Sequence, residues 1–447
     1  MFMQQFSLTV LAAVIFFSFF SYKKAVLFWL PAQFLFNAQV AVRYASPAMS
    51  LQIAVNIYLL LFFYIKYVLL GKNRKLTDKF PLWKMCILIF STYIISSIIS
   101  PYSTLRGFTT AIKYFVTDIG SIFLAFKFLE TDKDIRFFVK SCILVFFIII
   151  SLGISEFILN DNLWLDFVYI GSPHDGTTEG RMYYIPPFLG GGHEMRYGMI
   201  RAISTFAIHI SFGVACVVYF WLFLLMRIQK FNYVSQKTII TTALYILLGI
   251  FLCNSKTGMI GLVFVLLSLY SIKKLVNPLY FIIFLFFAVL LVIVFPEYLQ
   301  NFTSLFDPDV AEEGGGSTVA GRQRQFIIAM RMFSYNPIFG NGIGSIDVLK
   351  EISDNSDILG AESVWMQILP ERGLFGMLAY CYIFFAYYKC MIKEIPQKIL
   401  FFFLFSIFVM STVTGEISQS YWGIVIIAAY RMFRNKKKLE NNKVIIT

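Results

Sequence analysis

The stretch RFFVKSCILVFFIIISLGISEFI, residues 136–158, is dominated by apolar side chains. A helix needs about 20 mostly apolar residues to cross a hydrocarbon core about 30 Å thick, so this stretch is long enough to span a membrane once. Similar runs recur from end to end of the 447-residue chain, which is 58% hydrophobic and only 14% charged. The alternating ten-residue pattern of membrane β-strands does not occur. We therefore predict an all-α, polytopic integral membrane protein with a single membrane domain over residues 1–447.

The apolar runs predict about 12 to 13 transmembrane helices. They lie at residues 6–22, 25–42, 50–70, 83–100, 109–128, 136–158, 203–226, 237–253, 257–272, 277–295, 372–392, 397–413 and 415–433. The first run has an uncharged start and no small-residue cleavage site, so we expect a retained helix rather than a removed signal peptide. No period of 20–50 residues repeats, and no interrupted helices mark matching halves as they do in many transporters.

Basic residues mark every second connection and the C-terminus, which gives the predicted orientation. They are Lys23 and Lys24; Lys72, Arg74, Lys75 and Lys79; Lys133 and Arg136; Arg227, Lys230 and Lys237; Lys273 and Lys274; Lys393 and Lys398; and Arg431, Arg434, Lys436, Lys437 and Lys438. Since Lys and Arg accumulate in cytoplasmic loops, we place these connections inside and the two long segments, 159–202 and 296–371, outside. An odd number of helices leaves the N-terminus outside. The same bias explains the net charge of +13, so no nucleic-acid partner is expected.

The cysteines and histidines argue against a metal or disulfide protein. All six cysteines lie in or at the ends of apolar runs without CxxC spacing. His174, His193 and His209 are too scattered to form a metal set, and no cofactor is expected. His193 with Glu194 is a candidate acid/base pair, with an exposed polar loop dipeptide as the alternative. The glycine patterns GSTVAGRQ and GNGIGS lack the lysine or the preceding strand of nucleotide-binding loops, so both are expected to be turns.

The second outer segment contains a predicted amphipathic helix near 322–335, which Pro337 ends. At 100° per residue its side chains fall on two faces: Phe326, Met330 and Phe333 with Arg322 on one, and Arg324 and Arg331 on the other. Arg322 is therefore expected to point toward protein. The alternative is that this arginine snorkels back to water.

Charges inside or at the ends of the predicted spans are candidates for function, because a charge at the bilayer centre costs roughly 2.5–3.5 kcal/mol. They are Asp118, Glu156, Arg201, Lys256, Glu362, Glu371, Arg372 and Glu416. Several lie at the outer ends of helices, so we expect them to converge beneath the outer loops. They are either ion pairs that fasten helix ends or a site for an anionic lipid headgroup, since guanidinium groups match phosphate oxygens in two-point contacts.

The stretch AESVWMQILPERGLFG, residues 361–376, resembles the signature of the O-antigen ligase and Wzy-type polysaccharide polymerase superfamily. Ser363, Gly373 and Gly376 fit its spacing, and Glu362 stands where the ligases usually carry histidine. Four further stretches agree in order and separation: SEFIL at 155–159, MIRAISTF at 199–206, NSKTGMIG at 254–261 and GRQRQFIIAMRMFSYNPIFGNGIGS at 321–345. Each motif is short, and their joint order carries the resemblance.

The resemblance implies inverting, metal-independent glycosyl transfer from an undecaprenyl-pyrophosphate-linked sugar at the outer face of the bacterial inner membrane. Arg201 and Arg322 would hold the pyrophosphate, and Glu362 would take the proton from the acceptor hydroxyl. Alternatively, Glu362 binds a sugar hydroxyl or pairs with an arginine. Further substrate contacts are expected from Arg324, Arg372, Lys256, Glu156, His193 and Ser363.

Three functions remain open at this point. The first is a repeat-unit polymerase of O-antigen or capsule, with a flippase and a chain-length regulator as candidate partners. The second is an O-antigen ligase that transfers glycan to lipid A core, against which the missing histidine argues. The third is a lipid-linked oligosaccharide flippase, but its charges would line a central cavity through several helices rather than two large outer loops.

Overall fold

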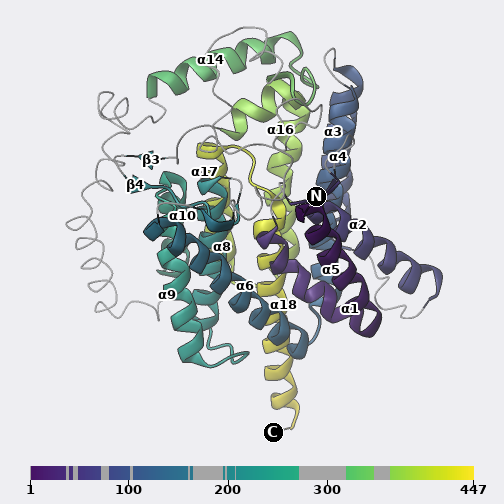
Figure 1. Ribbon diagram of the computed structural model, residues 1–447, viewed down its shortest axis with the longest axis vertical. Coiled ribbons are helices and arrows are strands. Elements are labelled where there is room, and N and C mark those ends of the chain that lie inside the picture. The colour runs from purple at the N-terminus through teal and green to yellow at the C-terminus, as the bar shows by residue number, and fades with distance from the viewer. Residues whose placement is uncertain are drawn as a thin grey trace.

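The computed structural model confirms an all-α polytopic membrane protein (Figure 1). It describes residues 2–36, 40–43, 49–71, 80–100, 104–159, 162–164, 195–196, 199–206, 208–270, 319–346 and 363–446. Within these residues, six helical stretches are long and apolar enough to cross a membrane: Gln4–Leu35, Leu51–Leu69, Asp132–Leu159, His209–Ile228, Val364–Met391 and Gln397–Thr414.

The first part of the chain forms α1 (Phe2–Ala32), η1 (Gln33–Leu35), β1 (Ala41–Arg43), β2 (Met49–Ser50), α2 (Leu51–Phe63), η2 (Tyr64–Leu69), α3 (Trp83–Ile99), α4 (Thr104–Tyr114), η4 (Phe115–Ile119), α5 (Gly120–Phe128) and α6 (Asp132–Leu159). The second part forms β3 (Met195–Arg196), β4 (Met199–Ile200), α8 (His209–Ile228), α9 (Gln236–Leu252), α10 (Lys256–Tyr270), α14 (Val319–Tyr335), α16 (Val364–Met391), α17 (Gln397–Thr414) and α18 (Gln419–Ile446). Every predicted span corresponds to a described helix except 277–295, which lies outside the described residues.

Helix α1 folds back on itself, as two separate predicted spans require. Ser21 has non-helical torsions, and the rings of Phe6 and Phe36 lie 6.4 Å apart. In a straight helix these residues would be about 45 Å apart. The two halves of α1 are therefore antiparallel, with Lys23 at the turn between them.

Several predicted boundaries were wrong, each for a local reason. The span 25–42 ends at Leu35, because β1 pairs antiparallel with β2 and leads the chain directly to Ser50, the N-cap of α2. The span 203–226 begins only at His209, because the residues before it form a turn. The span 372–392 begins earlier, at Val364, with a break at Gly373.

Helix α8 is the centre of the bundle and packs against α9, α10 and α18. It carries bulky side chains that are completely buried, including Phe212, Tyr219, Trp221 and Phe223. A helix that is apolar on all sides must be surrounded by other helices or by lipid. Here protein surrounds it, so the segments attached to its two ends are held on a rigid axis.

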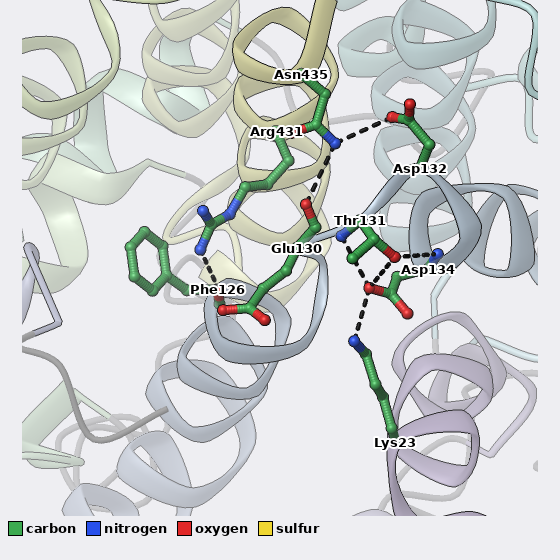
Figure 2. Close-up of polar contacts among 8 residues, drawn as sticks. All are labelled: Lys23, Phe126, Glu130, Thr131, Asp132, Asp134, Arg431 and Asn435. Atoms are coloured by element: carbon green, nitrogen blue, oxygen red, sulfur yellow. Dashed lines mark hydrogen bonds and ion pairs between the residues drawn. The ribbon is translucent and has the colours of Figure 1, made fainter. Parts of the chain in front are cut away.

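Figure 2 shows how α18 closes one end of the bundle. The side-chain amide of Asn435 donates to the carbonyl of Glu130 at 3.2 Å and to the carboxylate of Asp132 at 3.0 Å. Arg431 donates to the carbonyl of Phe126 at 2.6 Å and lies over the ring of the same residue. The last helix is therefore fastened to the turn between α5 and α6.

Other turns meet at this same end. Three contacts join them: Lys23 to Asp134 at 2.7 Å, Lys436 to the carbonyl of Gln229 at 3.2 Å, and Lys437 to Glu394 at 3.8 Å. Four of the connections that the positive charges predicted to share one side of the membrane, at Lys23, Lys133, Lys230 and Lys393, thus lie together here with the end of α18, whereas those at 72–79 and 273–274 lie outside the described residues. We call this the C-terminal end; α14 lies at the opposite end (Figure 1), which we call the α14 end.

Candidate active site

Arg201 sits on a buried turn at the α14 end, between β4 and α8. We call residues 201–206 the Arg201 turn; all six are buried. Glu156, at the end of α6, accepts hydrogen bonds from the backbone amides of Ile203 at 2.9 Å and Ser204 at 2.8 Å. The side-chain amide of Asn162 donates to the backbone carbonyl of Ser204 at 3.1 Å. Side chains from elsewhere in the chain thus fix the backbone that carries Arg201.

A second turn lies directly against the first. The amide of Ala202 donates to the carbonyl of Leu252 at 3.0 Å, at the end of α9. Asn254 follows with a positive φ of 41°, and the buried Ser255 leads into α10, whose first residue is Lys256. This backbone bond and the bonds to Glu156 bring together three of the stretches that carry the family resemblance, 155–159, 199–206 and 254–261. The predicted convergence of Glu156 and Arg201 on one region is observed.

Helix α14 carries Arg322 and Arg324 across the α14 end (Figure 1). Its buried face consists of Gln325, Ala329 and Met332, whereas Phe326 is 46% exposed. The predicted inner face was therefore wrong by about one position. Helix α14 packs on α16, and the side chain of Asn341 fixes the end of α14 by donating to the carbonyl of Met332 at 2.7 Å. Arg322 is half-buried beside this face, and Arg324 is exposed.

Helix α16 breaks at Gly373, whose torsions are φ 63° and ψ −162°. Only glycine adopts this region without strain. The turn at 336–346 is bonded to one side of the break. The backbone amides of Leu374 and Phe375 donate to the carbonyls of Pro337 and Ile338. The backbone amides of Asn341 and Gly342 donate to the carbonyls of Pro370 and Glu371, and all four bonds measure 2.8–3.0 Å. We call residues 336–346 the glycine turn. Its amides are used in holding α16, which agrees with the prediction that GNGIGS is a turn.

The side chain of Arg372 leaves the break in the other direction. It is 3% exposed, forms an ion pair with Glu416 between α17 and α18, and stacks on the ring of Tyr93 with 4.4 Å to the ring centroid. A Cβ on Gly376 would collide with the Arg372 side chain. The two glycines of the signature thus have separate causes: Gly373 allows the break, and Gly376 leaves room for the arginine. Of the two interpretations of the rim charges, Arg372 fits the ion pair that fastens a helix end.

The remaining candidates divide by position. Ser363 is the N-cap of α16 and accepts from the amide of Trp365 at 3.4 Å. Glu362 precedes it in the sequence and, like His193, lies outside the described residues. In the part of the chain that the structure describes, no group of three or more His, Cys, Asp or Glu side chains could hold a metal ion.

Sequence reasoning missed the partners of the ion pair. Glu416 stood out as a rim charge, but its bond to Arg372 joins residues 44 positions apart. Gln367, which accepts from the amide of Glu416 at 2.9 Å, and Tyr93 gave no signal at all, because each is an ordinary residue of an apolar run. Only Gly415, directly before Glu416 and with a φ of 103°, could have suggested a structured connection.

Comparison with known proteins gives a match to a family model. Residues 241–381 match the family model described as O-Antigen ligase. This region contains the start of α10, helix α14, the glycine turn and the break in α16. No curated protein and no solved structure matches the chain.

Proposed function

Since the chain belongs to the O-antigen ligase and Wzy-type polymerase superfamily, we propose that it polymerises lipid-linked oligosaccharide repeat units. The growing glycan would pass from its undecaprenyl-pyrophosphate carrier onto the next lipid-linked unit. The product would be an O-antigen or a capsular polysaccharide. Repeat-unit polymerisation is one specific activity within a family that forms glycans of the bacterial surface.

The observation that supports this proposal most is the fixed, buried position of Arg201. Glu156 and the carbonyl of Leu252 hold its turn at the backbone, and Lys256 begins the helix that follows the neighbouring turn. A pyrophosphate leaving group gains negative charge as its bond to the sugar breaks. Cations that are already in place stabilise that charge without reorganising during the reaction. We propose that Arg201 has this role, with Arg322 supplied from α14.

The proposed step is an inverting displacement. The acceptor hydroxyl of the next repeat unit attacks the anomeric carbon from the side opposite to the pyrophosphate. The carbon–oxygen bond to the pyrophosphate breaks, and the lipid pyrophosphate leaves with the electron pair. The hydroxyl proton passes to Glu362, which directly precedes the N-cap Ser363 of α16. No metal is required for this balance.

We further propose that the α14 end faces outward from the inner membrane. The clustered lysines and arginines of the C-terminal end support this, because positive charge accumulates on the cytoplasmic side. The lipid-linked substrate would then reach the Arg201 turn and α14 from the outer leaflet.

A reaction with purified protein and one defined lipid-linked repeat unit tests the proposal. A polymerase makes a ladder of products from this single substrate, since each unit serves as donor and as acceptor. A ligase gives no ladder and forms product only when lipid A core is added, and a flippase gives no glycosidic product with either mixture. Glu362→Gln should bind donor and lose transfer, whereas a wild-type ladder from this variant would remove the base role of Glu362.

A further inference from the structure

The connection between α17 and α18 contacts both halves of the candidate site. We call this connection, together with the first residues of α18, the linker (residues 415–421); it lies beyond residues 241–381, the part that matches the family. On one side Glu416 forms the ion pair with Arg372 of α16. On the other side the ring of Tyr421 lies 6.1 Å from the ring of Phe206, in the Arg201 turn. The linker thus bridges the Arg201 turn and α16, the helix on which α14 packs.

The linker is itself held in place by Asp118 in η4. This carboxylate accepts from the hydroxyl of Ser418 at 2.5 Å and from the amide of Ser420 at 2.9 Å. The side chain of Gln419 donates to the hydroxyl of Tyr114, whose ring stacks on Tyr93 at 5.2 Å. Asp118 and Gln419 are buried. A connection with so many buried polar contacts has one defined conformation, because each lost contact would leave a buried group unsatisfied.

The linker also holds the short helix Val364–Arg372, the part of α16 before the break. Gln367 accepts the amide hydrogen of Glu416 at 2.9 Å, and a Cβ on the adjacent Gly415 would meet the same Gln367 side-chain amide at 2.9 Å. The short helix is thereby held by the linker on one side and by the glycine turn on another. Its start carries Ser363, next to Glu362, and the glycine turn leads back to α14 and Arg322.

We propose that the linker is a positioning element for transfer, with Glu416 as its principal residue and Asp118 as its anchor. This inference rests on the proposed function, because it assigns what the linker positions. Glu416 touches no reacting group in this scheme. It sets the place of the short helix and of α14 relative to the Arg201 turn, so that Arg201, Arg322 and Glu362 act on the same substrate.

A set of ion-pair variants separates positioning from mere stabilisation. Glu416→Gln leaves the buried Arg372 without its counter-charge, and Arg372→Met leaves the partly buried Glu416 without its partner, so both should lower thermal stability and the rate of transfer. The double variant Arg372→Met/Glu416→Leu removes both charges, and such replacements often restore stability. It should recover the thermal midpoint of the wild type but remain about a hundredfold slower in transfer, since misplacement by about 1 Å costs that much. Recovery of stability and rate together would overturn the proposal.

A second measurement does not depend on the reaction. Spin labels on cysteines at Arg331, exposed on α14, and Leu378, exposed on α16 after the break, report the distance between these elements in a Cys381→Ser background. Glu416→Gln should broaden this distance distribution. An unchanged distribution would overturn the proposal.

The matched control is Asp134→Asn, which removes the same charge from an ion pair at the C-terminal end, Lys23–Asp134 at 2.7 Å. It should leave the label distribution of α14 as in the wild type. The two proposals fail separately: absence of any ladder from the wild type overturns the proposed function, whereas a narrow distribution in Glu416→Gln overturns the role of the linker.

Discussion

The carboxylate of Glu156 accepts the amide hydrogen of Ser204 at 2.8 Å and so holds a residue with a φ of 53° in place. A side chain in this left-handed region costs on the order of 1–3 kcal/mol and persists only where its surroundings fix it. Glu156 and Asn162 are part of those surroundings. The proposed pyrophosphate ligand Arg201 therefore depends on groups that are remote from it in sequence.

We predict that Glu156→Ala destabilises the protein, because two buried amides lose their acceptor and each such loss costs about 1–3 kcal/mol. Glu156→Gln keeps an acceptor oxygen but loses its charge, so its effect should be smaller. Thermal unfolding in detergent measures both. Ser155→Ala is the control, since among the described residues the Ser155 hydroxyl donates to the carbonyl of Leu152 in its own helix. Equal midpoints for Glu156→Ala and Ser155→Ala would contradict the prediction.

Three glycine-to-alanine changes should differ in how much they destabilise the protein. Gly373→Ala should cost at least about 1–3 kcal/mol from its torsions alone, and its methyl group would also meet the carbonyl of Ile338. Gly376→Ala should disturb the Arg372 side chain. Gly258→Ala is the control, because its nearest contacts would lie at an ordinary 3.6 Å. Amount of folded protein in the membrane and thermal midpoint are the measurements. A Gly373→Ala protein as stable as Gly258→Ala would show that the break is not required.

Arg201→Ala and Arg322→Ala should each abolish polymer without loss of protein. Losing one preorganised contact to a developing negative charge typically costs roughly 2.7–4 kcal/mol of barrier, a hundredfold or more in rate. Lysine should rescue only in part, since it lacks the two-point geometry of the guanidinium. Arg331→Ala, on the exposed side of α14, should behave as wild type. Normal ladders from either of the first two variants would show that its arginine has a structural role.

Impermeant thiol labelling in intact cells tests the orientation. With Cys381 replaced by serine, Tyr335→Cys at the end of α14 and Leu439→Cys on α18 offer positions that are 77% and 56% exposed. The cysteine at Tyr335 should react in intact cells, and the cysteine at Leu439 only after lysis. The reverse pattern would place the Arg201 turn in the cytoplasm and remove the outward-facing site.

The spans were largely predictable because each is a local run of apolar residues, and even the fold-back of α1 followed from Lys23 between two such runs. The buried face of α14 was not predictable from hydrophobicity, because the small Ala329 is buried while the larger and more apolar Phe326 is exposed. The ion pair of Arg372 with Glu416 was not predictable either, since hydropathy does not indicate which charges meet across the bundle.

The motif resemblance found the correct segments without the reason for their spacing. Gly373 and Gly376 fit a pattern in the sequence, but the break and the room for Arg372 are visible only in three dimensions. The Arg201 turn shows the same limit: its stretch was identified, whereas the bond from Ala202 to Leu252 was not.

The fastening of α18 has a consequence for biosynthesis. Its last turns bind the α5–α6 turn through Asn435, the α8–α9 turn through Lys436 and the α16–α17 turn through Lys437. The ribosome makes α18 after the other described helices, so these turns leave the translocon before their common partner exists. The C-terminal end of the bundle can therefore close only after α18 has been synthesised, and a nascent chain stalled before Arg431 would hold the preceding helices in the membrane without these contacts.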